Sequence, residues 1–354
     1  MRFRRSILLL SLVSLIGLTG VVSACTIPVF RYALDYWPPD MYEVALLHEG
    51  TLSPEAQVAF DRLQQAASNE HSPANIRVTP VNRTESPNQT AEMTVPPNLP
   101  WMTIKYPLYS RTSGTVWSGA LTVDAVEMVL DSPRRNEIAR RLLKGESAVW
   151  VLLESGHSQQ DEAAASLLHA QLLKMSVNLK VAVPDESGAP QYEGGESVTF
   201  SMIRLSRNDP AERVFVQMLL GTEWDLETAQ TPIAFPIYGR GRALYALVGD
   251  GINAENIKAA CEFLIGWCSC QVKDLNPGVD LLISADWGDT IREGSEVYQN
   301  TLSMLGLSEN IASDVENGSS VRRHILVGIL IPMLMVGLAG ACVVIWRLRR
   351  TSNN

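Results

Sequence analysis

The chain has 354 residues, of which 46% are hydrophobic and 19% are charged. This apolar content excludes a chain that is disordered along most of its length, and five cysteines are too few for a small disulfide-dense scaffold. Eight of the 29 basic residues lie in residues 1–25 and 322–354, which hold no acid, so residues 26–321 carry 21 basic and 38 acidic residues, a net charge of −17. Such an acidic body excludes nonspecific nucleic-acid binding, because attraction to phosphate requires the opposite sign. The length predicts two domains, at roughly 100–200 residues each.

Residues 1–24 have the pattern of a signal peptide, with arginines before an apolar run and small residues at its end. Cys25 follows, and Val22-Ser23-Ala24-Cys25 also matches the site at which bacteria cleave and lipidate exported proteins. Two alternatives stay open: a lipoprotein anchored through Cys25, or an ordinary signal peptide followed by an unmodified cysteine. We expect residues 25–41 to form a short extracytoplasmic segment.

Residues 42–145 predict a first α/β domain, in which short apolar runs alternate with amphipathic stretches. Ser53 and Pro54 have the residue types that begin a helix, and residues 82–99 are rich in loop-forming residues. In order, the expected elements are strand 42–47, helix 53–68, strand 76–81, a hairpin of 101–106 and 115–120, and helices over 123–130 and from 133 to 144.

Residues 146–274 predict a second domain with a similar order. Its expected elements are strand 148–153, helix 160–176, strands 179–183 and 200–205, helix 210–220, a hairpin of 233–238 and 243–248, and helix 253–267. YEVALLHEG at 42–50 lies at the same place in the first half as AVWVLLESG at 148–156 in the second. This correspondence favours an internal duplication, and the alternative is one mixed sheet without a repeat.

The C-terminal end predicts a membrane anchor. Residues 325–346 are 22 residues without a charge, enough for a helix to cross a hydrocarbon core of ~30 Å. Residues 275–324 would form a juxtamembrane segment, and residues 347–354 a tail. Together with the signal peptide, this pattern predicts a single-pass protein of the bacterial inner membrane, with its body in the periplasm and its tail in the cytoplasm.

Each half resembles the thioredoxin fold, most closely from Thr231 to Gly249 and from Asn253 to Leu264. The resemblance implies two tandem thioredoxin-like domains, each a mixed sheet flanked by helices. In that family a proline opens the third strand with a cis peptide, so the resemblance implies cis bonds at Pro100 and Pro232. The chain is also similar to exported, membrane-anchored proteins of planctomycete-type bacteria, through CTIPVFRYAL at 25–34 and NPGVDLL at 276–282. That second resemblance implies no activity.

The chain departs from the thioredoxin family where the redox chemistry resides. Thioredoxins carry Cys-x-x-Cys between the first strand and the first helix, where the helix N-terminus lowers the thiol pKa. The corresponding positions are HEGT at 48–51 and SGHS at 155–158, and neither contains a cysteine. We therefore expect no catalytic residues by this route, and a fold used for binding.

Two local features remain as candidate sites. Cys268 and Cys270 are close enough to bind a soft metal such as Cu(I) or to form a strained disulfide. Their alternatives are a structural disulfide or buried thiols, and no histidine lies nearby to complete a zinc site. Arg240 and Arg242 flank a glycine turn that would bind an anion through guanidinium and backbone N–H groups; the alternative is a turn with solvated arginines.

These observations predict a non-enzymatic interaction module, an accessory subunit of a transporter-like membrane complex. Its partners would be the membrane and a membrane protein, with no nucleic acid and no cofactor. The alternative is a thiol- or copper-handling redox protein that uses Cys268 and Cys270. A hydrolase would need a cluster of catalytic side chains that the sequence does not display.

Overall fold

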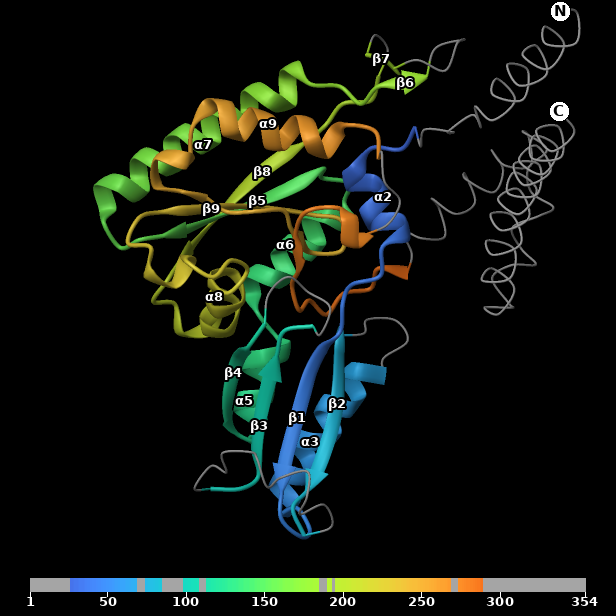
Figure 1. Cartoon of the computed structure of the whole chain (residues 1–354), viewed down its shortest axis with the longest axis vertical. Coiled ribbons are helices and arrows are strands. Elements are labelled where there is room, and N and C mark those ends of the chain that lie inside the picture. Colours follow the sequence, from blue (N-terminus) through green and yellow to red (C-terminus); the bar gives the residue numbers. More distant parts are fainter. Residues whose placement is uncertain are drawn as a thin grey trace, which may run out of the picture. The chain divides into compact units, whose positions relative to one another are not determined.

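The computed structural model describes residues 26–68, 74–84, 98–107, 113–184, 190–192, 195–268 and 273–288 (Figure 1). The chain divides into two compact units, Met1–Ile291 and Arg292–Asn354, and all described residues belong to the first. No helix among the described residues has the length and apolar character needed to cross a membrane. The predicted signal peptide (1–24), Cys25, the predicted spanning segment (325–346) and the predicted tail (347–354) lie outside them.

The first sheet is a mixed four-stranded sheet with the order β2-β1-β3-β4. β1 is parallel to β2 and antiparallel to β3, which pairs antiparallel with β4. Alternate residues of the central strands, such as Val44, Leu46 and Ile104, are buried under two helices that cover one face of the sheet (Figure 1). The elements of this part are β1 (Tyr42–His48), α3 (Pro54–Ser68), β2 (Ile76–Asn82), β3 (Trp101–Lys105), β4 (Thr115–Ala120) and α5 (Val123–Leu130).

The second sheet repeats this order around a central strand that is buried on both faces. β5 is parallel to β8 and antiparallel to β9, and β9 pairs antiparallel with β10 and β11. Every residue of the apolar run Ala148–Leu153 in β5 is buried, as expected for a strand covered on both sides. The elements are α6 (Pro133–Leu143), β5 (Ala148–Glu154), α7 (Ser158–Asn178), β8 (Phe200–Ser206), α8 (Arg213–Leu220), β9 (Ile233–Tyr238), β10 (Arg242–Ala243), β11 (Leu247–Val248), α9 (Ala254–Ile265) and β12 (Val279–Asp280).

The two faces of β5 belong to two different hydrophobic cores. Trp150 and Leu152 pack in a core with α7 and α9, whereas Val149 and Val151 pack in a core with α6 and α8. The core with α6 and α8 also contains the buried face of the first sheet, so this one hydrophobic core runs from one sheet to the other.

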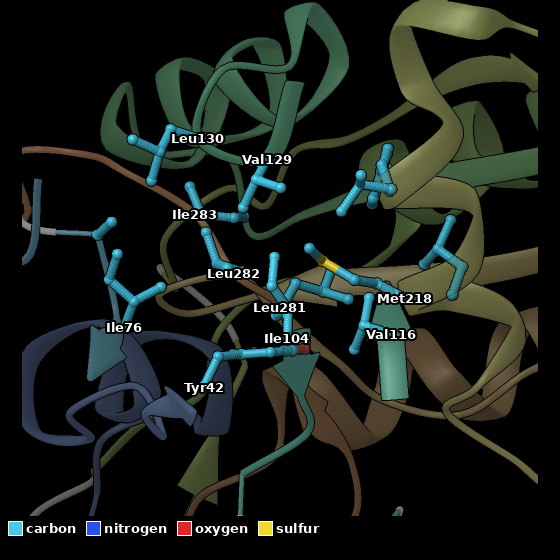
Figure 2. Close-up of a cluster of buried hydrophobic side chains, with 14 of the residues drawn as sticks. Tyr42, Ile76, Ile104, Val116, Val129, Leu130, Met218, Leu281, Leu282 and Ile283 are labelled. Atoms are coloured by element: carbon cyan, nitrogen blue, oxygen red, sulfur yellow. The ribbon is translucent and has the colours of Figure 1, made fainter. Parts of the chain in front are cut away.

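The C-terminal strap, residues 279–287, fills the space between the two sheets. Figure 2 shows Leu281, Leu282 and Ile283 among side chains of the first sheet, of α5 and of α8. The strap begins as β12, which pairs with β10 in the second sheet. It then meets the first sheet, where the Asn75 side chain donates to Leu281 O and accepts from Ile283 N–H. Residues 275–288, which the sequence predicted as part of a juxtamembrane segment, are therefore largely core.

The N-terminal helix α2 (Val29–Tyr36) packs against the second sheet rather than the first. Val29, Phe30 and Ala33 are buried beside α9, and the Val29 N–H donates to Gly266 O at 2.9 Å. The predicted segment 25–41 thus contributes a helix to the core with α7 and α9 before the chain enters β1.

Most predicted strands and helices are confirmed, with two differences near the second sheet. Of the expected strand 179–183, Lys180 forms an isolated bridge with Ser197, and Val183 pairs in the short hairpin of β6 (Val183–Pro184) and β7 (Pro190–Gln191). The expected strand 243–248 is divided into β10 and β11, and the pairing register with β9 shifts by one residue between Ala243, opposite Ile237, and Leu247, opposite Ala234. The mixed α/β class and two helix-flanked sheets of matching strand order agree with the sequence prediction.

Candidate functional site

The loop between β5 and α7 corresponds to the position at which thioredoxins carry Cys-x-x-Cys. The Asp161 carboxylate is buried and accepts from Ser155 N–H at 2.7 Å, Ser155 Oγ at 2.8 Å and Gly156 N–H at 3.0 Å. Gly156 takes a positive φ of 91°, which the loop needs to turn toward the helix. Asp161 therefore fixes the conformation of the loop. The Ser155 hydroxyl donates its hydrogen bond to Asp161 and is not oriented toward a substrate.

The equivalent loop of the first sheet is also without a nucleophile. His48 Nδ1 lies 2.9 Å from Gly50 O, and the imidazole is partly exposed at the end of β1. No group of three or more His, Cys, Asp or Glu side chains that could hold a metal ion occurs among the described residues. Neither loop offers the paired groups that covalent or metal-assisted catalysis requires.

A groove of about 440 Å³ lies beside the β5–α7 loop. One wall is the first half of α7, and the other consists of the turn before β9 and the turn before α9. Its apolar lining is Ala163, Ala164, Leu167, Pro232 and Ile252, and its polar lining includes Gln160, Thr231 and Asp250. This mixture of small apolar side chains with a few polar groups suits a partly buried apolar ligand group.

Pro100 and Pro232 occupy matching positions in the two sheets but differ in their peptide bonds. Leu99–Pro100 is cis, whereas Thr231–Pro232 is trans, which corrects the expectation for Pro232. The trans isomer is the ordinary one for a peptide bond before proline, and with it Pro232 still lies at the start of β9. In both sheets the proline carbonyl accepts a backbone N–H from after the hairpin: Leu121 donates to Pro100 O, and Gly249 to Pro232 O.

The cysteines of the described chain are buried thiols. Cys261 is fully buried in α9, and burial raises the pKa of its thiol to about 12, so it is protonated and unreactive at neutral pH. Cys268 is 1% exposed in the same core, and its backbone N–H donates to Ile27 O at 2.9 Å. Cys270 lies outside the described residues, so the proposed pairing of Cys268 with Cys270 stays a prediction.

Arg240 and Arg242 do not form the anion-binding turn that the sequence predicted. Arg240 donates to Leu34 O at 2.7 Å and to Asp35 O at 2.9 Å, which satisfies carbonyls at the end of α2. Arg242 is buried and donates to Asp280 Oδ1 at 2.8 Å. Both guanidinium groups are therefore bonded to segments that are distant in the sequence.

Asp280 is the centre of a buried ion cluster that sequence reasoning missed. It pairs with Arg242 and Lys273, and its second oxygen accepts the Asp40 N–H at 2.7 Å. Lys273 also pairs with the Asp40 carboxylate at 2.7 Å. The cluster joins the start of β1, the hairpin turn and the strap. In the sequence, the mostly apolar run VDLLI at 279–283, which follows the turn NPG at 276–278, is the pattern that indicates a buried strand.

Arg135 and Glu212 are two further buried charged residues, and each bonds to groups near the start of α6. Arg135 is 1% exposed and donates to Leu282 O of the strap at 2.6 Å and to Val129 O at 2.7 Å. Desolvation lowers the pKa of Arg135 to about 10, partly opposed by the charge of Glu212. Glu212 accepts the Arg134 N–H at the beginning of α6. These groups fix α6 between the two sheets.

Comparison with known proteins gives only weak similarity to solved structures. No family model and no curated protein matches the chain. Among solved structures, it is similar to the first two thioredoxin domains of Saccharomyces cerevisiae Eps1p, with 9% identity, a TM-score of 0.22, and coverage of 66% of this chain and 94% of that one. The corresponding domains of Naumovozyma dairenensis Eps1p give 10% identity, a TM-score of 0.21, and coverage of 68% and 95%. Strand order and direction in the two sheets support a thioredoxin-like fold. The resemblance to exported planctomycete proteins stays a prediction.

Proposed function

We propose that this chain is a non-enzymatic, extracytoplasmic interaction module, an accessory subunit of a transporter-like membrane complex. In this proposal two tandem thioredoxin-like domains arose by duplication, and the segment 325–346 anchors them in the bacterial inner membrane. The proposal rests on one observation. The β5–α7 loop is closed by Asp161 and has no thiol, while an apolar groove of about 440 Å³ remains open beside it.

The groove supports binding rather than catalysis. Its walls offer small and aliphatic side chains that would desolvate an apolar group of a partner polypeptide, whereas Gln160, Thr231 and Asp250 would hydrogen-bond at the edge. Burial of Cys268 and of Cys261 weighs against the alternative, a thiol- or copper-handling protein, because metal capture and thiol exchange need an accessible thiolate.

The test is affinity purification of the full chain from native membranes in mild detergent, with mass spectrometry of co-eluting proteins and of the cysteine peptides. We expect a stoichiometric membrane protein to co-elute. Ala164→Arg, which places a long cation in the groove, should remove that partner, whereas Val58→Arg, at an exposed position of α3, should retain it. Bound copper, or a Cys268–Cys270 disulfide without any co-eluting protein, would overturn the proposal in favour of the thiol-handling alternative.

A further inference from the structure

Strand β4 has no partner strand on one of its two sides among the described residues. It pairs with β3 only and is the outermost strand of the first sheet (Figure 1). The Leu121 N–H donates to Pro100 O, and in an antiparallel ladder every second residue bonds toward the same neighbour. The N–H and C=O groups of Ser118 and Ala120 therefore point away from β3. Both residues are exposed, and no other described residue bonds to these backbone groups.

The strands at the other three ends of the two sheet orders carry residues that disfavour the addition of a strand. β2 contains Arg77 and Pro80, β8 contains Arg204, and β12 contains Asp280. A charge or a proline in an edge strand hinders pairing with another chain. β4, with the sequence TVWSGA at 115–120, has neither. Of these four strands, β4 alone is therefore left open to pairing.

Trp117 extends an apolar surface along this edge. Its half-buried indole packs against the core that runs between the two sheets, and it lies over Gly119, where a Cβ would come within 2.5 Å of the ring. Trp117 and Gly119 are opposite Ile104 and Met102 of β3, which are buried, so the indole lies on the core side of the sheet. A glycine inside a strand often marks a place where another backbone comes close. Beside Gly119, an added strand has room for a side chain that would cover the exposed part of the indole.

These features fit an extended peptide segment better than a second folded copy. α8 packs at the start of β4, where Val116 is buried beside Met218 (Figure 2), so the open part of the edge centres on Ser118 and Ala120. Even over its full six residues, β4 is only about 20 Å long. Two strands of this length bury far less than the roughly 1,200 Å² of a stable interface between folded proteins. The edge has no charge, so its complement is an uncharged segment with apolar residues on the core side.

We propose that an extended, uncharged segment of a partner polypeptide adds to β4 as a further strand of the first sheet. The N–H and C=O groups of Ser118 and Ala120 form the main-chain hydrogen bonds, and an apolar side chain of the segment packs beside Gly119 against Trp117. In this mode of recognition the main-chain bonds supply the affinity, and the space for alternate side chains supplies the preference for sequence. The site goes beyond the proposed function, because it uses none of the residues that line the groove beside the β5–α7 loop.

The first test is the binding of a fluorescein-labelled peptide, Gln-Thr-Val-Thr-Leu-Thr-Val-Thr-Gln, to the full chain in mild detergent, measured by fluorescence anisotropy. The alternating sequence favours an extended strand that is apolar on one side, and it carries no charged side chain. We expect saturable binding below about 200 μM. Ser118→Pro should weaken binding by about tenfold or more, because it removes an outward N–H and places a ring at the edge. An edge strand tolerates this change, since the N–H makes no bond within the sheet.

Two controls separate strand addition from a general effect on the protein. Ser118→Ala removes the hydroxyl but keeps the backbone N–H, so it should bind the peptide as the wild type does. Methylation of alternate peptide amides tests the pairing without any change in the protein. Only one of the two alternate sets faces β4, so methylation of that set should abolish binding, whereas methylation of the other set should leave it unchanged.

Three results would overturn the inference: no binding to the wild type at about 200 μM, equal binding to the wild type and Ser118→Pro, or an equal effect of both methylated sets. A chain that dimerises in sedimentation equilibrium, and loses the dimer in Ser118→Pro, would overturn it in favour of a second copy at β4. Ala164→Arg, which blocks the groove, should leave the peptide bound. Failure of this site is therefore distinguishable from failure of the proposed function.

Discussion

Asp280→Asn is the substitution that should most severely destabilise the fold. The Asp280 carboxylate is 4% exposed and receives Arg242 at 2.8 Å, the Asp40 N–H at 2.7 Å, and Lys273. Asparagine has nearly the same shape but no charge, and it keeps one acceptor oxygen for these three donors. Arg242, which is 7% exposed, would be left as a buried cation without its counter-ion.

The magnitude follows from that burial. Removing one partner of a buried ion pair costs about 3–5 kcal/mol, and Lys273 retains Asp40 as a partner, so we expect about 3 kcal/mol. This is a large part of the roughly 5–15 kcal/mol by which a folded domain is stable. With a urea dependence of about 3 kcal/mol per molar, the unfolding midpoint should fall by about 1 M.

Urea unfolding followed by tryptophan fluorescence measures this shift, with Glu262→Gln as the control. Glu262 pairs with Lys258 on the exposed side of α9, and its loss should change the free energy of unfolding by about 0.5 kcal/mol or less. If Asp280→Asn lost less than about 1 kcal/mol, the cluster would be hydrated rather than buried, and the reasoning about the strap would be refuted.

Three further results are expected from urea unfolding. Tyr106→Phe removes the hydroxyl that donates to Gln217 O and Met218 O, and it should cost about 1 kcal/mol. Gly239→Ala should cost about 2 kcal/mol or more, since φ is +58° and a Cβ would lie 2.6 Å from that of Ala33; Gly156→Ala, with open space around it, should cost less. Burial raises the pKa of Cys261 to about 12, so the folded chain keeps a proton that the unfolded chain releases near pH 8.5. The contribution of the Cys261 thiol to the free energy of unfolding is complete below that pH and is lost as the pH rises toward 12. A lower urea midpoint at pH 10 than at pH 8 would show this loss.

The strands and helices could be read from the sequence where a local pattern decides them. The unbroken apolar run 148–153 predicts a strand buried on both faces, and β5 is such a strand. Asn253 predicts the start of α9, where its side chain accepts the Asn256 N–H. The alternation in residues 179–183 predicts one continuous strand, whereas the segment pairs only in pieces, at Lys180 with Ser197 and at Val183 with Gln191, because pairing depends on where the neighbouring chain lies.

The candidate sites were less predictable, because their partners are remote in the chain. Arg240 finds its acceptors at Leu34 and Asp35, more than 200 residues away, and Arg242 finds Asp280 only after the strap has returned. Arg135 has the residue type of a solvated helix face, yet the helix presents it to the carbonyl of Leu282. A window along the sequence contains no information about such pairings, since each depends on the packing of the whole fold.

The strap also has a consequence for the order in which the chain can fold. Asp40 meets Asp280 across 240 residues, and Asn75 meets Leu281 across 206. Contacts that close such long loops form late, and a chain emerging from the ribosome lacks them until its strap has been synthesised. Until then Tyr42, Ile76 and Ile104 have no strap to cover them, and both sheets expose apolar surface. A chain cut short before residue 279 should therefore remain a substrate for chaperones and proteases, even though it contains eleven of the twelve strands found among the described residues.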